Sequence, residues 1–465
     1  MHDVSTFSMI TNDSRAVKAG AIFAALPGVA DNGCAYINAA IKAGASYVLA
    51  PLGTPKPQAD IIWQESADIR KDYAMLCAQF YNAQPEHIVA VTGTNGKSSV
   101  VSFARQLWGD DAVSLGTIGL QGAGMDQPAA LTTLDPAILH EILARCANQG
   151  VKKLALEASS HGLEQSRLAG VKIQAAAFTN ISHDHLDYHK TMAAYLQAKL
   201  RIFDQMERGA PAIINADLPQ SAEIIAYAQA RGLKVLTFGM QAEALKIISA
   251  EPVFNGIEAV IAVNGVRKEF LLPLLGRFQL YNALAALALT YPDALLENID
   301  RLHKLTPVHG RMDKIEGHPK GAQVFVDYAH TPDALETVLK ALKPHLPKGG
   351  RLVALIGCGG DRDNTKRAPM ARIAGALADH VIVTDDNPRG EDPALIRKDV
   401  LAGFPAAEEI GGRGLAIKAA VKMLNAQDIL LVAGKGHEQG QTIGSTVTPF
   451  DDSNEVIKAY KEARI

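Results

Sequence analysis

A glycine-containing polar segment that follows an apolar run has the composition of a phosphate-binding loop. Residues 91–99 read Val-Thr-Gly-Thr-Asn-Gly-Lys-Ser-Ser, and the apolar residues 88–91 predict a buried strand before them. Gly93 and Gly96 allow the backbone to turn sharply and approach a polyphosphate, while Lys97 supplies a positive charge for the β- and γ-phosphates. The segment therefore predicts a nucleoside triphosphate as cosubstrate.

The residues around this lysine refine the prediction. The Ser98 hydroxyl can reach Mg²⁺, and a helix that starts near Ser99 directs its positive end at the same anion. The strict P-loop pattern requires a glycine five positions before Gly96, where this chain has Val91. Generic GTPases and motor ATPases therefore match the segment poorly.

A carboxylate follows a second expected strand, residues 153–156. Glu157 begins the segment Glu-Ala-Ser-Ser-His-Gly. A carboxylate at a strand end of a nucleotide-binding domain is a natural Mg²⁺ ligand. The alternative is an exposed glutamate in a turn.

A dense group of histidines and aspartates follows the next expected strand, residues 175–178. Such a group suggests metal or phosphate chemistry at the same sheet edge, although each histidine alone could be a surface or packing residue. Imidazole suits zinc, but no cysteine and no HExxH spacing supports a zinc site. The members of the group are His183, Asp184, His185, Asp187 and His189.

Two further strand ends carry charged residues in the last third of the chain. Asp327 and His330 follow the strand expected at 323–326, and Arg311 lies upstream in His-Gly-Arg. An arginine supplied from a neighbouring domain can neutralise charge on a transferring phosphoryl group.

Arg362 and Arg389 lie in loops after neighbouring expected strands. A pair of guanidinium groups suggests a bidentate carboxylate site. The alternative is ordinary loop structure, because Asp-Asn and Asn-Pro are turn formers.

Size and composition restrict the class of protein. The chain has 465 residues, of which 48% are hydrophobic, and 46 Lys and Arg balance 49 Asp and Glu for a net charge of −3. This balance gives no support for binding to nucleic acid or a membrane surface. The four widely spaced cysteines predict free thiols in a reducing compartment. With no apolar leader and no membrane-length apolar stretch, we expect a cytoplasmic protein.

The pattern of strands and helices predicts an α/β fold with about three domains. We place these domains at residues 1–84, 85–307 and 308–465, with a largely parallel sheet covered by helices in the second. Ligands bind at the carboxyl ends of strands in such sheets. The other expected elements are strands at 20–26, 46–50, 212–214, 352–356, 380–383 and 429–432 and helices at 36–43 and 68–81.

Nine segments in this order resemble the Mur ligase family of bacterial cell-wall synthesis. Folylpolyglutamate synthetases share the phosphate loop but would not be expected to carry DNPR or EASSHG. The resemblance implies a small N-terminal α/β domain, a central P-loop ATPase-like domain and a C-terminal Rossmann-like domain. The segments are DSR (13–15), TGTNGKSS (92–99), EASSHGLEQSR (157–167), NISHDHLDYH (180–189), HGRMD (309–313), DYAHTPDAL (327–335), CGGDRD (358–363), DNPR (386–389) and GKGHE (434–438).

The resemblance also implies roles for individual residues. Catalytic positions would be Lys97, Glu157, His185, Lys199 and Arg311. Contacts to the uridine-linked substrate would come from Asn12, Ser14, Thr132, Thr133, Ser159, Gln165 and Arg167. ATP would be bound by Gly93, Thr94, Asn95, Gly96, Lys97, Ser98, Ser99, Asn282 and Asp327. Two Mg²⁺ ions would be held by Ser98, Glu157, His185 and Lys199.

Lys199 falls where the family carries an N-carboxylated lysine. A bare ammonium would repel Mg²⁺, whereas a carbamate is an anionic oxygen ligand. Without the family, the residue would be interpreted as an ordinary lysine on a helix surface.

DNPR is similar to the signature of family members that add meso-diaminopimelate instead of lysine. Diaminopimelate carries a second carboxylate, which the Arg389 guanidinium can bind. If lysine were bound instead, the buried guanidinium would remain unpaired, and the free-energy penalty on lysine binding would exceed about 1.5–3 kcal/mol. The amino-acid contacts implied are Arg362, Asp386, Asn387, Pro388, Arg389, Gly434 and Glu438.

The chain departs from the family pattern at three places. Leu131 stands before the two threonines where a polar residue is more usual, and Gln279 replaces an expected Asn. The loop 28–31 is less polar than in relatives, which affects the details of uridine binding.

The expected activity is an ATP-dependent amide ligase. It would join meso-diaminopimelate to the D-Glu side-chain carboxylate of UDP-MurNAc-L-Ala-D-Glu through an acyl phosphate. His330 is a candidate for the base that deprotonates the attacking amine. Two alternatives remain: a ligase for lysine or another amino acid, and a non-catalytic relative that serves as a scaffold.

Overall fold

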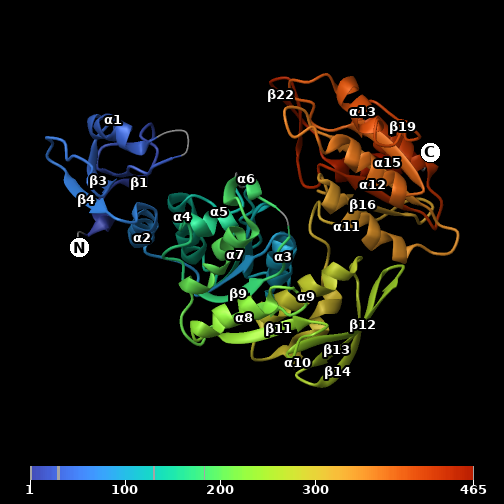
Figure 1. Cartoon of the computed structure of the whole chain (residues 1–465), viewed down its shortest axis with the longest axis horizontal. Helices are drawn as coiled ribbons and strands as arrows, with labels where there is room; N and C mark the ends of the chain where they lie inside the picture. The colour runs from blue at the N-terminus through green and yellow to red at the C-terminus, as the bar shows by residue number, and fades with distance from the viewer. Residues whose placement is uncertain (1–2, 29–31, 129–130, 183, 464–465) are drawn as a thin grey trace. The chain divides into compact units, whose positions relative to one another are not determined.

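The computed structural model of the chain describes residues 3–28, 32–128, 131–182 and 184–463. The chain divides into two compact units, Met1–Lys246 with Leu284–Asn298 and Ile247–Ala283 with Ile299–Ile465. Both combine helices with largely parallel sheets (Figure 1), so the predicted α/β class is confirmed. Among the described residues, no helix has the length and apolar character needed to cross a membrane.

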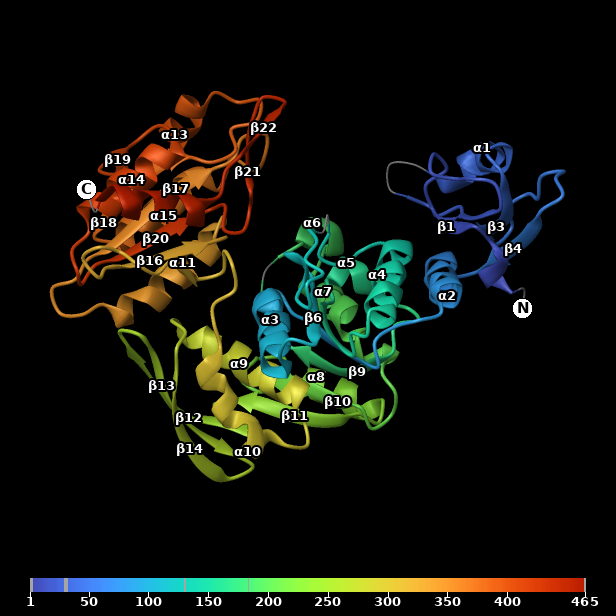
Figure 2. The ribbon, with the colours of Figure 1, turned by 180° about the vertical axis from the view of Figure 1, so that it is seen from behind.

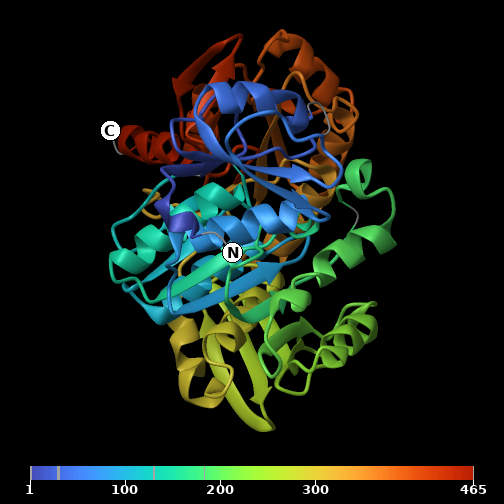
Figure 3. The same ribbon diagram turned by 90° about the vertical axis from the view of Figure 1, so that its left-hand side faces the viewer.

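The N-terminal part of the first unit is a parallel sheet in the order β1-β2-β3-β4, drawn in blue in Figure 3. Helix α2 begins after Asp68, whose side chain accepts a hydrogen bond from the Lys71 N–H, and ends at the left-handed Asn82. The elements are β1 (Met9–Thr11), β2 (Ala21–Ala24), α1 (Ile37–Lys42), β3 (Ala45–Pro51), β4 (Ile62–Ser66) and α2 (Ile69–Tyr81).

A second sheet of the first unit runs in the order β11-β10-β9-β5-β8-β6-β7, and only β6 with β7 is antiparallel. Figure 2 shows α3 and α8 beside its strands. The strands are β5 (His87–Thr92), β6 (Ala112–Gly116), β7 (Gly119–Gln121), β8 (Lys153–Glu157), β9 (Ile173–Phe178), β10 (Pro211–Asn215) and β11 (Lys234–Gly239). The helices are α3 (Lys97–Trp108), α4 (Pro136–Asn148), α5 (Ser160–Glu164), α6 (Leu186–His189), α7 (Met192–Leu200) and α8 (Ser221–Ala230). Helix α9 (Arg277–Thr290) belongs to the second unit up to Ala283 and to the first unit from Leu284.

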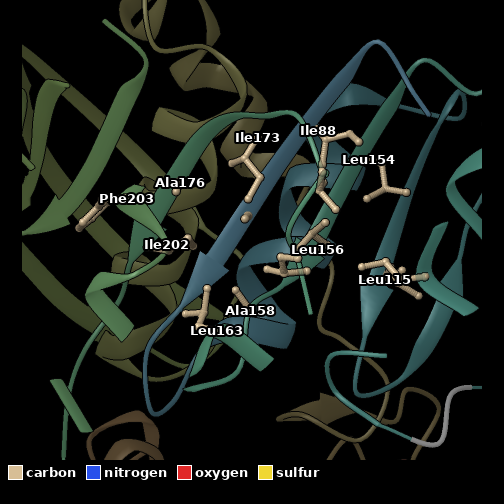
Figure 4. Close-up of a cluster of buried hydrophobic side chains, with 14 of the residues drawn as sticks. Ile88, Leu115, Leu154, Leu156, Ala158, Leu163, Ile173, Ala176, Ile202 and Phe203 are labelled. Carbon is tan, nitrogen blue, oxygen red and sulfur yellow. The ribbon is translucent and has the colours of Figure 1, made fainter. Parts of the chain in front are cut away.

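Aliphatic side chains from the central strands hold this sheet against its helices (Figure 4). Ile88 of β5 lies among Leu154 and Leu156 of β8 and Ile173 of β9, all fully or almost fully buried. Strands buried on both faces must be apolar along their whole length. The polar residues are therefore confined to the strand ends, where the predicted chemistry lies.

The second unit contains a six-stranded sheet in the order β15-β16-β20-β17-β18-β19, parallel except for β15. Helices α11 to α13 contribute to one apolar cluster and α14 and α15 to another. The strands are β15 (Asp313–Lys314), β16 (Gln323–Asp327), β17 (Leu352–Cys358), β18 (His380–Asp385), β19 (Glu408–Glu409) and β20 (Ile429–Ala433). The helices are α11 (Pro332–Leu342), α12 (Arg367–Leu377), α13 (Pro393–Leu401), α14 (Arg413–Met423) and α15 (Asp452–Ala463).

The structure differs from the sequence predictions in several elements. The helix after the phosphate loop begins at Lys97 and not near Ser99, because Gly96 adopts a left-handed conformation (φ 85°) and turns the chain directly into the helix. Several strands were not predicted, notably β12 (Leu245–Val253), β13 (Gly256–Val263), β14 (Val266–Leu272), β21 (Gly440–Ile443) and β22 (Thr446–Pro449). The four cysteines are free as predicted, although Cys34 is only partly buried.

A buried ion pair ties α14 to α15 and to the sheet of the second unit. The Arg413 guanidinium donates two hydrogen bonds of 2.6 Å to Asp452, and both side chains are inaccessible to solvent. Arg413 also donates to the carbonyl oxygen of Ala433, at the end of β20. The pair therefore supports the strand ends that carry the candidate site.

Replacing Arg413 by methionine should lower the free energy of unfolding by about 3–5 kcal/mol, because Asp452 would remain buried without its partner. Urea-induced unfolding of the full chain measures this change. Lys418→Met removes an exposed ion pair with Glu462 and should cost at most about 1 kcal/mol. Equal effects of the two substitutions would contradict a structural role for the buried pair.

Candidate active site

The phosphate loop has a backbone that only glycine accommodates at its first turn. Gly93 has φ 145°, and a Cβ atom there would lie 2.0 Å from Oγ1 of Thr179. Gly96 precedes the first residue of α3, and no side chain caps this helix end. The N–H groups of the first helical turn are thus directed toward the loop, as phosphate binding requires.

The loop after β9 holds the phosphate loop in place. The Asn180 side chain accepts a hydrogen bond from the Asn95 N–H at 2.8 Å and donates to the Asn95 carbonyl oxygen at 2.9 Å. The Thr94 N–H donates to the Asn180 carbonyl oxygen, and the Ser182 N–H donates to the Thr94 hydroxyl. Because β5 and β9 are parallel neighbours, their ends meet at one edge.

Two lysine side chains converge on a single carbonyl oxygen. Lys97 Nζ donates to Gly93 O at 2.9 Å, and Lys199 Nζ donates to the same oxygen at 2.8 Å. Lys199, on α7, is only 1% exposed, which contradicts the interpretation as a helix-surface lysine. Burial, followed by repulsion from Lys97, lowers the pKa of Lys199 well below its usual value. A neutral amine is therefore favoured at this position.

Glu157 is enclosed by hydroxyl and amide donors. It is 2% exposed at the end of β8, and its Oε1 accepts hydrogen bonds from Ser98 Oγ at 2.8 Å and from the Thr117 N–H at 2.9 Å. Oε2 accepts from Thr117 Oγ1, whose hydroxyl also bonds Thr132 Oγ1 at 2.9 Å. The buried position contradicts the alternative of an exposed glutamate in a turn.

The predicted metal ligands are gathered only in part. Ser98 and Glu157 are in direct contact and offer the hard oxygen ligands that Mg²⁺ prefers. The His185 ring lies 6.2 Å from the Tyr195 ring, and Lys199 Nζ lies 4.3 Å from the centre of the same Tyr195 ring. Within residues 3–28, 32–128, 131–182 and 184–463, no group of three His, Cys, Asp or Glu side chains could hold a metal. His183, predicted as part of the histidine group, lies outside these residues.

Four residues predicted to contact the substrate form one hydrogen-bonded group. Thr133 Oγ1 donates to the Glu157 carbonyl oxygen and accepts from the Ser159 N–H. Arg167 donates to the Thr133 carbonyl oxygen at 2.7 Å and to Gln165 Oε1 at 2.7 Å. Thr132 lies beside them through its bond to Thr117, so the structure brings these predicted residues together around the end of β8.

The remaining predicted substrate residues of the first unit lie in its N-terminal part. Asn12 Nδ2 donates to Asp135 Oδ2 at 2.8 Å, and the Tyr73 hydroxyl donates to Asp135 Oδ1 at 3.1 Å. The same Asp135 caps α4 by accepting from the Ala137 N–H. Ser14 is partly exposed. Of the less polar loop 28–31, residues 29–31 lie outside the described part.

In the second unit, Asp327 anchors the segment that carries Arg311. Its carboxylate accepts hydrogen bonds from the Met312 N–H at 2.7 Å and the Ala329 N–H at 2.8 Å. Burial raises the pKa of Asp327, and the charge of Arg311 and the two N–H donors oppose that shift. The Arg311 guanidinium lies 4.5 Å from the centre of the Tyr328 ring.

The DNPR and GKGHE segments meet at the ends of β18 and β20. Asn387 Nδ2 donates to Glu438 Oε2 at 2.8 Å, and Lys435 Nζ donates to Asn387 Oδ1 at 3.0 Å. A Cβ atom at Gly434 would lie 2.8 Å from Asp386 Oδ2. Asp386, Asn387 and Pro388 are buried.

The arginines predicted to bind carboxylates lack acidic partners among the residues that the structure describes. Within the described residues, neither Arg362 nor Arg389 forms an ion pair, and Arg311 Nε is buried without a hydrogen-bond partner. Arg389 is partly buried, and its guanidinium group donates to the Gly360 and Asn387 carbonyl oxygens. Other arginines of this unit pair with carboxylates, namely Arg351, Arg367, Arg397 and Arg413.

Two other predicted residues have local partners. Asn282, on α9, donates from Nδ2 to Gln279 Oε1 at 3.0 Å, so the departure at Gln279 lies in direct contact with the predicted adenine ligand. His330 bonds the Tyr328 carbonyl oxygen through Nδ1, and burial lowers its pKa. A neutral His330 is favoured, as a base requires.

Three residues that organise these sites were not predicted from the sequence: Asn180, Thr117 and Lys435. Asn180 lies in the segment NISHDHLDYH and Lys435 in the segment GKGHE, and these positions within family segments could have marked both residues as part of a site. Thr117 is a single threonine after β6 with no local pattern, and only the parallel pairing of β6 with β8 brings it to Glu157.

Three family models match successive parts of the chain. They are the catalytic domain of the Mur ligase family at residues 6–71, the Mur ligase middle domain at 91–290 and the Mur ligase glutamate ligase domain at 310–436. The chain also resembles the UDP-N-acetylmuramoyl-L-alanyl-D-glutamate–2,6-diaminopimelate ligase of Caulobacter vibrioides, with 45% identity over 97% of this chain and 95% of the relative. The chain belongs to the Mur ligase family.

Solved structures agree with this assignment. A UDP-N-acetylmuramoyl-L-alanyl-D-glutamate–2,6-diaminopimelate ligase superposes with a TM-score of 0.74 and 34% identity, covering 99% of this chain and 96% of the other. MurF ligase from Thermotoga maritima, in complex with ADP, has a TM-score of 0.63 at 18% identity, covering 100% and 99%. The second likeness shows the fold alone. The predicted fold class and family are confirmed.

Asn180→Ala should weaken ATP binding about ten-fold, because the substitution removes both hydrogen bonds that fix Asn95 of the phosphate loop. Isothermal titration calorimetry with ATP measures the affinity. Asn454→Ala, at an exposed position of α15, serves as the control and should leave the affinity unchanged. An unaltered affinity in Asn180→Ala would rule out this role.

Proposed function

We propose that the protein is an ATP-dependent ligase that adds meso-diaminopimelate to the D-Glu side-chain carboxylate of UDP-MurNAc-L-Ala-D-Glu. Membership of the Mur ligase family and the names of the closely similar relatives support the reaction. The observation that carries the choice of amino acid is Arg389, a partly buried guanidinium at the end of β18 without an acidic partner in the described chain.

The phosphate loop and Lys97 fit a nucleoside triphosphate. The uncapped start of α3 offers N–H donors, and the Lys97 ammonium group donates to the Gly93 and Thr94 carbonyl oxygens of the loop. ATP supplies the phosphoryl group that activates the substrate carboxylate. Lys97 stabilises the charge that develops during this transfer.

Ser98 and Glu157 fit Mg²⁺ because both present oxygen atoms within one buried contact. A bound Mg²⁺ supplies positive charge beside the phosphates. Thr117 keeps the Glu157 carboxylate oriented through two hydrogen bonds. His185 and Lys199 complete the proposed set of ligands.

Lys199 is suited to carboxylation. Carbamate formation joins the neutral amine nitrogen to the carbon of CO₂ and releases one proton, so it requires the unprotonated lysine that burial favours. A carbamate would also replace the repulsion between Lys199 and Lys97 by attraction. We therefore propose Lys199 as an N-carboxylated metal ligand.

Arg389 and Arg362 account for the choice of amino acid. A guanidinium group binds a carboxylate with two parallel hydrogen bonds, and diaminopimelate has one carboxylate more than lysine. The attacking amine must lose a proton, and His330 is the proposed acceptor on the evidence of its neutral ring.

The proposed domains are residues 1–84, 85–307 and 308–465. The nucleotide-linked substrate supports the cytoplasm as the location.

Two alternatives make different predictions. A lysine ligase would need an acidic or neutral group at the position of Arg389. A scaffold would be free to lose Lys97, Glu157, His185 or Lys199, and all four residues are present.

The wild-type protein should release phosphate from ATP with UDP-MurNAc-L-Ala-D-Glu and meso-diaminopimelate, and much more slowly with L-lysine. Arg389→Ala should reduce kcat/KM for diaminopimelate by about ten-fold to a hundred-fold, the effect of about 1.5–3 kcal/mol. The control is Arg372→Ala, at an exposed position of α12. Equal use of lysine by the wild type would refute the proposed specificity, and no turnover with either amino acid would favour the scaffold.

Lys199 carboxylation should be visible as a mass increase of one CO₂ on the intact protein at alkaline pH, lost on acidification. The variant Lys199→Arg cannot form a carbamate and should lack both the mass increase and the ligase activity. The ATP affinity of this variant distinguishes misfolding from the loss of the carbamate as a metal ligand, because a folded variant still binds ATP. An active Lys199→Arg protein would contradict the proposal.

A further inference from the structure

Lys435 is the only residue of the GKGHE segment whose side chain is 0% exposed, and the proposed mechanism gives it no role. Its ammonium group donates hydrogen bonds to Asn387 Oδ1 at 3.0 Å, Glu438 Oε2 at 3.1 Å and the Gly440 carbonyl oxygen at 2.6 Å. An ammonium group has three N–H donors. All three are therefore used, and they connect DNPR, GKGHE and the first residue of β21.

This arrangement fixes the orientation of the Asn387 amide. Lys435 can only donate, and the Thr442 N–H also donates to Asn387 Oδ1, at 3.0 Å. The oxygen of the amide must therefore face Lys435 and Thr442, which turns the Nδ2 group toward Glu438 Oε2 at 2.8 Å. With Oε2 bonded to Lys435 and Asn387, no described residue donates to Oε1 of Glu438.

The same ammonium group also fixes the β21–β22 hairpin against the DNPR segment. Lys435 holds Gly440 O at the start of the hairpin, and Gln441 Nε2 donates to the Asp386 carbonyl oxygen at 2.7 Å. Further along β21, the Arg389 N–H donates to the Thr442 carbonyl oxygen at 3.1 Å. The backbone of Arg389 and the side chain of Glu438 are thus connected through one buried lysine.

We propose that Lys435 is a positioning residue for the amino-acid substrate, which holds Glu438 and Arg389 in one fixed arrangement without touching the substrate itself. The inference rests on the proposed function, because it concerns the binding of a zwitterionic amino acid with two carboxylates. Glu438 Oε1 remains available for an ammonium group, and Arg389 for a carboxylate.

The test is steady-state kinetics of the full chain with Lys435→Met, which keeps the length of the side chain but removes its donors. The KM for meso-diaminopimelate should rise about ten-fold or more, as expected for the loss of charge-assisted hydrogen bonds. The KM for ATP and for UDP-MurNAc-L-Ala-D-Glu should stay within about two-fold, and the preference for diaminopimelate over lysine should fall. A merely structural role would alter all three KM values or none.

Lys458→Met is the matched control, because it removes an exposed lysine of the same unit that pairs with Glu455. If Lys435→Met does not unfold cooperatively, Thr442→Pro replaces it. That variant removes the Thr442 donor to Asn387 Oδ1 from a partly exposed strand and leaves Lys435 intact. It should also raise the KM for diaminopimelate selectively.

Each outcome separates this inference from the proposed function. A wild type that does not use diaminopimelate overturns the proposed function. If the wild type is active but the folded Lys435→Met protein has an unchanged KM for diaminopimelate, the role of Lys435 alone is overturned. The same holds for an unchanged KM in Thr442→Pro, when that variant replaces Lys435→Met.

Discussion

Parallel pairing of β5 with β8 and β9 is the constraint on which the candidate site of the first unit depends. It brings the ends of three strands to one edge, and with them Gly93, Glu157 and Asn180. None of these residues is near another in sequence. The buried aliphatic strands fix the spacing of this edge, so the precision of the polar site derives from an apolar core.

Each unit contains a buried lysine, and their surroundings give the two residues opposite chemistry. Lys435 donates to three acceptors, one of which is the Glu438 carboxylate. Lys199 has one described acceptor, an uncharged carbonyl oxygen, and lies close to the charge of Lys97. Whether a buried lysine is structural or reactive therefore depends on the charge of its neighbours and not on burial alone.

The sequence was most informative where a strand buried on both faces ended in polar residues. The strands before Gly93, Glu157, Asp327 and Asp386 could be predicted because continuous apolar runs mark them. The strands β12 to β14 were not predicted, because each contains exposed or partly exposed residues and none forms a continuous buried run. Thr117 could not be predicted at all, since its contact with Glu157 exists only after β6 pairs with β8.

The carboxylate of Asp135 has a consequence for the integrity of the first unit. Its two oxygens are shared between the cap of α4 and the side chains of Asn12 and Tyr73, and Ala137 packs into the apolar cluster of the N-terminal sheet. The peptide that links the sheet to β5 is therefore not its sole attachment. A protease that cleaves between Asn82 and Glu86 would leave two fragments bound to each other, held by this carboxylate and the cluster beneath it.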